Sequence, residues 1–158
     1  MTMPATCSRP LLLFVVFALA ADGAAAGTWR FESPRTHPET LVSLSGDGSG
    51  NLVAVGADSA VVVSNDGGRS WKLGRLGGRD HLLSVAMLPG QSVLAVGTSG
   101  TVWRSEDGGL GWRPQALFSA TTLRGIFFVH PAVGWAVGDM GAIFLSRDAG
   151  RLWGRLSQ

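Results

Sequence analysis

The stretch "GWAVGDMGAIFLSRDAGRLW", residues 134–153, decides how this chain folds. An apolar run is interrupted at Gly138 and Gly141, resumes over residues 142–145, and ends in the pattern Ser-x-Asp-x-Gly-x-x-Trp. Short apolar runs separated by glycine and aspartate are typical of β-strands joined by tight turns. The aspartate of the pattern, Asp148, is either a catalytic acid or part of a structural turn.

The pattern of this stretch occurs three times, at a spacing of 41 residues and without insertions. One leucine and an Ala-Val-Gly triplet are identical in every copy: Leu41, Leu82 and Leu123, then residues 54–56, 95–97 and 136–138. The four positions of the Ser-x-Asp-x-Gly-x-x-Trp pattern are identical as well: Ser64, Asp66, Gly68 and Trp71; Ser105, Asp107, Gly109 and Trp112; Ser146, Asp148, Gly150 and Trp153. A fixed period of this length indicates a repeat architecture.

Each copy contains four expected strands. In the first copy they are Leu41–Ser45, Asn51–Gly56, Ala60–Ser64 and a fourth that begins at Trp71. A period near 40 with four strands per copy is typical of a β-propeller blade. The strands are apolar along their length, which predicts sheets covered on both faces. The predicted fold is therefore all-β, a partial or open propeller of three four-stranded blades at residues 41–81, 82–122 and 123–158.

The repeated pattern resembles the Asp-box hairpin (also called the BNR repeat) found in many propellers. Its aspartate can accept hydrogen bonds from backbone N–H groups of its own turn. Its glycine permits a positive φ, and its tryptophan buries a large ring that anchors the hairpin. A catalytic acid is needed once, whereas this aspartate occurs in all three copies. We therefore expect the Asp-box residues to be structural.

The N-terminal segment has the features of a secretory signal. Arg9 precedes an apolar run over residues 11–21, and residues 24–26 offer a cleavage site. The run is shorter than the ~20 apolar residues that a membrane-spanning helix needs. We expect residues 1–26 to be a signal peptide, residues 27–40 an N-terminal strand and linker, and the mature chain to be periplasmic or extracellular without a membrane span.

Composition argues against several kinds of site. The single cysteine, Cys7, lies in the signal, so the mature chain has no disulfide, no cysteine metal site and no thiol nucleophile. The basic residues are scattered rather than clustered, so a nucleic acid is not an expected partner. His37 and His81 fall in linkers and His130 in a turn, without the spacing of metal ligands. No metal or cofactor is expected.

The sequence gives no support for a catalytic site. The chain contains no tyrosine, which excludes the tyrosine nucleophile that sialidases use. No pair of carboxylates outside the Asp-boxes stands out as the acid and base of another glycosidase. No catalytic residue is predicted, and the chain is expected not to be an enzyme. A carbohydrate-binding or degenerate sialidase-like protein stays open as an alternative.

The third copy shows a more specific likeness. Residues 123–153, with Gly-Trp-Ala-Val-Gly at 134–138 followed by the Asp-box, resemble the repeat of the YCF48 family of photosystem II assembly factors. The first two copies match more loosely, and the likeness extends over residues 29–158. The resemblance implies a protein-binding scaffold or an assembly and stability factor, with a protein as its partner.

The number of repeats departs from that family, whose photosystem II members have seven blades. Three readings stay open: a truncated fragment of a longer propeller, an open arc of three blades, or copies that pair into a ring. An open arc would expose two apolar blade faces and favour self-association. Three arginines that follow the Asp-box tryptophans, Arg75, Arg113 and Arg155, form a candidate partner-binding rim.

Overall fold

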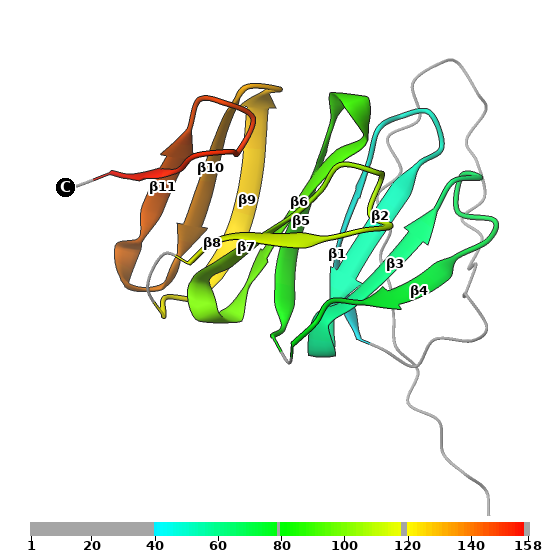
Figure 1. Ribbon diagram of the computed structural model, residues 1–158, viewed down its shortest axis with the longest axis horizontal. Helices are drawn as coiled ribbons and strands as arrows, with labels where there is room; N and C mark the ends of the chain where they lie inside the picture. Colours follow the sequence, from blue (N-terminus) through cyan, green and yellow to red (C-terminus); the bar gives the residue numbers. More distant parts are fainter. Residues whose placement is uncertain (1–39, 79, 118–119, 157–158) are drawn as a thin grey trace, which may run out of the picture. The chain divides into compact units, whose positions relative to one another are not determined.

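The computed structural model describes residues 40–78, 80–117 and 120–156, which form three four-stranded antiparallel sheets (Figure 1). The expected signal peptide and residues 27–39 of the expected N-terminal strand and linker lie outside the described residues. All described residues belong to one compact unit. The all-β fold predicted from the repeat is confirmed.

The three sheets are the three blades, and in each one the strands follow the order of the sequence. Blade 1 contains β1 (Leu41–Gly46), β2 (Leu52–Gly56), β3 (Ala60–Ser64) and β4 (Lys72–Arg75). Blade 2 contains β5 (Leu82–Leu88), β6 (Ser92–Gly97), β7 (Thr101–Ser105) and β8 (Arg113–Leu117). Blade 3 contains β9 (Leu123–His130), β10 (Val133–Gly138), β11 (Ile143–Ser146) and β12 (Gly154–Arg155).

Short 3₁₀ turns join the second and third strands of each blade: η1 (Ala57–Ser59), η3 (Thr98–Gly100) and η4 (Asp139–Gly141). A fourth turn, η2 (Pro89–Gln91), joins β5 to β6.

Two local predictions need correction. Trp71 does not open the fourth strand, because β4 begins at Lys72 and the indole belongs to the preceding turn. His130 is the last residue of β9 rather than part of a turn.

The glycine of each Ala-Val-Gly triplet marks the point where the incoming linker crosses the blade. The N–H of Ala57 donates to the carbonyl of Thr40 at 2.8 Å, just after Gly56. The same bond recurs from Thr98 to His81 and from Asp139 to Thr122, both at 3.0 Å. A Cβ on Gly56 would collide with the Thr40 carbonyl. A larger residue therefore cannot replace this glycine without moving the linker.

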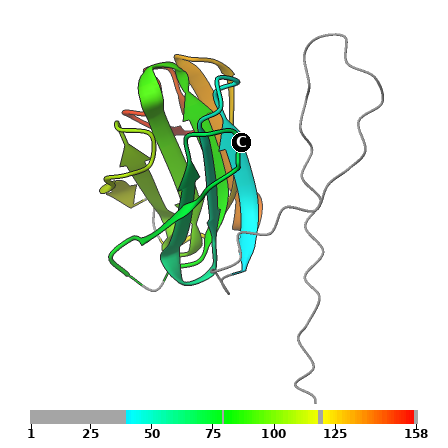
Figure 2. The same cartoon turned by 90° about the vertical axis from the view of Figure 1, so that its right-hand side faces the viewer.

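Apolar side chains fill the two spaces between neighbouring blades. One cluster lies between blades 1 and 2 and includes Val53, Val93 and Trp103; the other lies between blades 2 and 3 and includes Leu94 and Phe144. In Figure 2 the first strands β1 (cyan) and β9 (orange) lie on one side of this unit, and β8 and β12 lie on the opposite side. Blade 2 is therefore packed between two other blades.

The prediction that the sheets are covered on both faces is confirmed for some strands and not for others. The inner strands β2, β3, β6 and β7 are buried along most of their length. By contrast, β4 is exposed throughout and β1 alternates between half-buried and exposed positions. Among the described residues, no helix is long and apolar enough to cross a membrane.

Candidate functional site

The Asp-box of blade 1 is a closed network of hydrogen bonds. The Ser64 hydroxyl donates to Oδ1 of Asp66 at 2.8 Å, and its oxygen accepts the N–H of Gly68 at 2.9 Å. The backbone N–H of Ser70 donates to Oδ1 of Asp66 at 2.9 Å, and its hydroxyl donates to Oδ2 at 2.5 Å. The indole N–H of Trp71 donates to the carbonyl of Gly68 at 2.9 Å. The carboxylate is thus occupied by groups of its own turn.

The two other Asp-boxes repeat this network. Asp107 accepts the N–H groups of residues 110 and 111, and Asp148 accepts those of residues 151 and 152, all between 2.8 and 3.0 Å. The Ser70 hydroxyl is the main cause that lowers the pKa of Asp66 to about 2. The Ser105 hydroxyl lowers the pKa of Asp107, and the N–H of residue 152 lowers that of Asp148. All three carboxylates are held ionised, which is the opposite of what a general acid requires.

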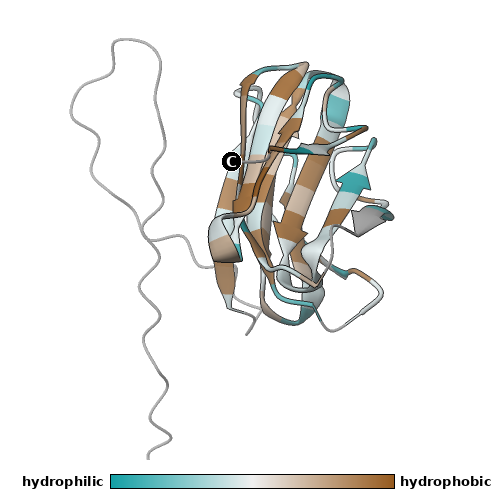
Figure 3. Ribbon diagram, turned by 90° about the vertical axis from the view of Figure 1, so that its left-hand side faces the viewer, coloured by the Kyte–Doolittle hydropathy of each residue, from teal (hydrophilic) through white to brown (hydrophobic). Residues whose placement is uncertain are grey.

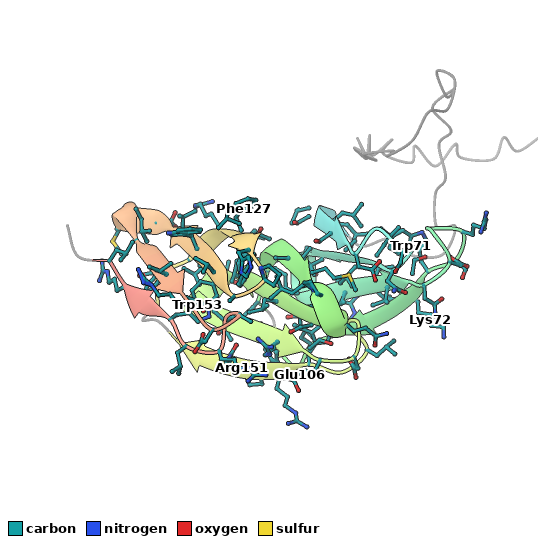
Figure 4. All side chains as sticks on the ribbon, turned by 90° about the horizontal axis from the view of Figure 1, so that it is seen from above. Trp71, Lys72, Glu106, Phe127, Arg151 and Trp153 are labelled. Atoms are coloured by element: carbon teal, nitrogen blue, oxygen red, sulfur yellow. The ribbon has the colours of Figure 1, made fainter. Side chains whose placement is uncertain are left out.

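The second and third Asp-boxes also contact the preceding blade. Trp112 packs against the cluster between blades 1 and 2. Trp153, labelled in Figure 4, packs against the cluster between blades 2 and 3. Nη1 of Arg104 in blade 2 donates to the carbonyl of Ala149 at 2.7 Å, and Nε2 of Gln115 donates to that of Arg151 at 2.8 Å. This hairpin therefore joins neighbouring blades.

The three arginines of the candidate rim do not share one level of the outer strands. Arg75 lies opposite Ala60 at the start of β3, whereas Arg113 lies opposite Arg104 near the end of β7. Arg155 lies at a third level, opposite Phe144. Arg75 also donates from Nη1 to the carbonyl of Asp58 at 3.1 Å. The three arginines therefore stand at different levels of their outer strands.

The two described histidines are separate from each other. Nδ1 of His81 accepts the N–H of Asp58 at 3.2 Å, and Nδ1 of His130 accepts the N–H of Ala132 at 3.3 Å. Among the described residues, no group of three histidine, cysteine, aspartate or glutamate side chains is placed to hold a metal ion.

The most distinctive surface lies on blade 3, on the face turned away from blade 2. Strand pairing places Phe127, Trp135 and Leu145 in one row across β9, β10 and β11, and Val137 and Ile143 in the row beside it. We call these five residues, with Val129, the Phe127 face. Phe127 is 65% exposed, Val129 64% and Val137 44%. Figure 3 views this end of the sheets, where hydrophobic bands run along the strands.

A shallow groove of about 310 Å³ borders the Phe127 face on the side of the first strands. Its lining includes Met87 and Pro89 of blade 2 and Phe127, Val129 and His130 of blade 3. Figure 4 shows Phe127 on the opposite side of the sheets from Glu106 and Arg151. The groove and the Phe127 face share Phe127 and Val129, so the two adjoin.

The sequence predicted bare blade faces but did not identify the residues of this one. The sequence did contain a signal for these residues, because two positions of the third copy differ from the other two copies. Phe127 stands where the first two copies have Ser45 and Ala86. Trp135 stands where they have Val53 and Leu94. The third copy therefore carries the largest apolar side chains at two positions of the face that no described blade covers.

Comparison with known proteins supports the fold. No family model matches the chain, and no curated protein matches its sequence. A solved structure described as YCF48 bound to D1 peptide has a TM-score of 0.66 and 23% identity, over 76% of this chain and 40% of that one. YCF48 from Cyanidioschyzon merolae has a TM-score of 0.62 and 20% identity, over 74% of this chain and 39% of that one.

Enzymes share the same architecture. The GH74 xyloglucanase from Xanthomonas campestris has a TM-score of 0.59 and 18% identity, over 74% of this chain and 23% of that one. The chain thus spans about 40% of the length of the YCF48 structures and less of the xyloglucanase. The arrangement of the three sheets, the repeated Asp-boxes and these likenesses show that the chain has the fold of a YCF48-like β-propeller, in which the described residues form three blades.

Proposed function

We propose that this chain is an exported, non-catalytic scaffold that binds another protein through the apolar surface of blade 3. The observation that carries the proposal is the exposure of Phe127 and Val129, at 65% and 64%, on a face shaped like those that bind the next blade. Contiguous exposed apolar surface marks interaction sites. The YCF48 structure bound to a D1 peptide is an example of this fold holding a polypeptide.

The placement of the acids supports a non-catalytic role. The Asp-box carboxylates are held by their own turns, as described above. Asp139 forms an exposed ion pair with Arg124, which lowers the pKa of its carboxyl, and Oδ1 of Asp80 accepts the Ser99 hydroxyl at 2.9 Å. A glycosidase needs two carboxylates facing each other across a cleft. The residues that line the groove beside blade 3 include no carboxylate, and His130 is the titratable group among them.

Export is the part of the proposal that the N-terminal sequence supports. The composition of residues 1–26 matches a signal peptide, and a chain without a cysteine after Cys7 needs no disulfide in an oxidising compartment. Fractionation of cells that express the full chain, with mass spectrometry of its N-terminus, is the direct check. We expect a product in the periplasm or medium that begins near residue 27. An uncleaved product inside the cell would contradict export.

Site-directed photo-cross-linking tests the binding role. A benzophenone amino acid replaces Phe127 in the full chain, expressed in its native host. A matched variant carries the same group at Leu110, which is 69% exposed but lies in the Asp-box turn of blade 2. We expect a discrete protein adduct at position 127 and none at position 110. Equal labelling at both positions, or none at 127, would contradict a binding site on blade 3.

Carbohydrate binding is the second candidate, because the GH74 xyloglucanase shares the blade arrangement. Titration of the purified chain with xyloglucan oligosaccharides, followed by the fluorescence of its tryptophans, distinguishes the two candidates. We expect no saturable change. A saturable change that is lost when Trp135 becomes alanine would instead assign the face to a glycan.

A further inference from the structure

The first strands of blades 1 and 2 are joined by two hydrogen bonds, each from a backbone N–H to a serine hydroxyl. The N–H of Val85 in β5 donates to Oγ of Ser43 in β1 at 3.2 Å. Two residues further along the same strands, the N–H of Met87 donates to Oγ of Ser45 at 3.0 Å. The hydroxyls of β1 thus satisfy two N–H groups at the edge of β5.

The interface between blades 2 and 3 repeats the first of these bonds but not the second. β9 lies beside β5 (Figure 1), and the N–H of Ile126 donates to Oγ of Ser84 at 3.2 Å, one repeat after the bond of Val85. The equivalent of the second bond would run from the N–H of Phe128 to residue 86. That residue is Ala86, which has no hydroxyl. Blade 2 therefore offers Phe128 no such acceptor.

The N–H of Phe128 is directed to the same side of β9 as that of Ile126. Residues two apart in a strand point their N–H groups in the same direction, and the pairing of β9 with β10 is regular over residues 125–128. β9 is the edge strand of its sheet, so this side faces away from β10. The N–H of Phe128 is consequently a donor at a sheet edge, without the serine partner that Met87 has.

The groove of about 310 Å³ lies at the position of the missing bond. Ala86 and Phe128 both line it, together with Phe127 and Val129 of the Phe127 face. Ala86 and Phe128 are half-buried, so the N–H lies in partly dry surroundings. A backbone donor that is shielded from water gains more from an acceptor than an open one does.

The polar groups of the groove indicate what kind of ligand it suits. Ser45 and His130 are the lining residues with polar side chains, and both already accept hydrogen bonds: Ser45 from Met87, and Nδ1 of His130 from the N–H of Ala132 at 3.3 Å. The lining includes no lysine, arginine or carboxylate. One backbone donor between apolar walls suits a carbonyl flanked by apolar groups. It suits a sugar poorly, because each enclosed hydroxyl needs a hydrogen-bond partner of its own.

We propose that this groove binds an extended apolar peptide segment of a partner protein, with a backbone carbonyl of the segment accepting the N–H of Phe128. The inference rests on the proposed function in that it takes the partner to be a protein, and it names the segment and the donor. Phe127 and Val129, which are 65% and 64% exposed, supply apolar contact for the side chains beside that carbonyl. In peptide recognition, main-chain hydrogen bonds give affinity and pockets for side chains give specificity.

Ala86→Ser is the variant that tests the donor. By analogy with Ser45, the introduced hydroxyl should accept the N–H of Phe128 and so withdraw it from a ligand. Ala86→Cys is the matched control, because a thiol adds a side-chain atom at the same place but is a weak acceptor. Thermal melting followed by circular dichroism verifies that both variants fold.

A phage-displayed library of random short peptides is the probe, selected against the purified full chain under reducing conditions. We expect apolar peptides to be enriched, and fluorescence anisotropy of synthetic copies measures their affinity. Ala86→Ser should weaken binding about tenfold, the effect of one lost hydrogen bond, whereas Ala86→Cys should bind like wild type. The proposal is overturned if no peptide is enriched, if Ala86→Ser binds as tightly as wild type, or if both variants lose affinity equally.

Amide exchange of Phe128, followed by NMR, reports on the donor itself. In wild type this amide should exchange more slowly once a selected peptide is added. In Ala86→Ser it should exchange slowly before any peptide is present, because the introduced hydroxyl already holds it. A Phe128 amide whose exchange in wild type is unchanged at saturating peptide would contradict the assigned hydrogen bond.

Failure of this inference is distinguishable from failure of the proposed function. If the benzophenone at position 127 captures a protein equally well with Ala86 and with Ala86→Ser, the scaffold role stands and the hydrogen bond from Phe128 does not contribute to it. If selected peptides bind as described but no adduct forms in cells, the groove is a peptide site and the proposed scaffold role fails. An adduct that is lost in Ala86→Ser and kept in Ala86→Cys supports both.

Discussion

At the scale of single residues, the Asp-box aspartates show how a carboxylate can be structural without being buried. Asp66 accepts hydrogen bonds from Ser64 and from both the N–H and the hydroxyl of Ser70. These donors stabilise the ionised form and hold its pKa near 2, below the ~3.9 of an unstructured aspartate. The repeat was sufficient to predict this structural role, because the aspartate recurs three times with the same serine, glycine and tryptophan around it.

This lowered pKa makes the fold sensitive to acid. A carboxyl whose native pKa lies below its unfolded value stabilises the fold above the unfolded pKa. That stabilisation is lost as the pH falls from about 4 toward 2. We expect Asp66→Asn to be less stable than wild type near neutral pH and to show a shallower decline in the free energy of unfolding over this interval. Urea unfolding at a series of pH values measures both.

Asp58→Asn is the control for that measurement, because Asp58 lies outside the three Asp-boxes. It removes a carboxylate of the same blade but leaves every Asp-box intact, so its free energy of unfolding should decline more steeply with acid than that of Asp66→Asn. Parallel curves for wild type and Asp66→Asn would show that the Asp66 carboxylate contributes nothing to the acid dependence, and the hydrogen bonds described above would not have the assigned effect.

At the scale of elements, the Asp-box hairpin is a joint between blades as well as a turn within one. The glycine of each Asp-box was predicted from its need for a positive φ, and Gly109 has a φ of 94°. The structure adds a second reason, since a Cβ there would lie 3.1 Å from methyl groups of Val53 and Val63 in the preceding blade. A sequence read one repeat at a time does not reveal this contact, because it joins different copies.

Alanine substitutions distinguish the need for a positive φ from the packing against the preceding blade. Gly108 and Gly109 are neighbours with positive φ angles of 73° and 94°, but only Gly109 faces another blade. Gly108→Ala should therefore lose only the conformational contribution, about 1 kcal/mol. Gly109→Ala should lose a further ~1–3 kcal/mol through overpacking against blade 1. Thermal unfolding of the two variants measures the difference, and equal losses would contradict a packing role for Gly109.

At the scale of the whole molecule, the repeat determined the number of blades and the strand order, whereas the surfaces at the two ends needed the structure. The arginine rim was inferred from proximity to the Asp-box tryptophans, but a shift of one to four residues along a strand changes both height and face. Arg75, Arg113 and Arg155 consequently lie at three levels. The Phe127 face emerges only when residues that pair across β9, β10 and β11 are read together.

Strands that are packed on both faces should be locally more stable than strands packed on one face, which produces a gradient of local stability across the blades. Residues 93–96 of β6 are fully buried between two clusters, whereas β10 of blade 3 leaves Val137 44% exposed. Amides in strands with more buried apolar contacts open less often and exchange more slowly with solvent. At low protein concentration we therefore expect amides of β6 to exchange more slowly than those of β10, as measured by hydrogen exchange with mass spectrometry.

The dependence of that gradient on concentration connects it to the binding face. If a second copy covers the Phe127 face, exchange of β10 should slow as the protein concentration rises, while β6, already enclosed, should not change. Phe127→Asp should abolish the slowing of β10 and leave β6 as in wild type. Exchange of β10 that is independent of concentration in wild type would mean that no second copy reaches this face, because a covered strand cannot retain the exchange rate of an uncovered one.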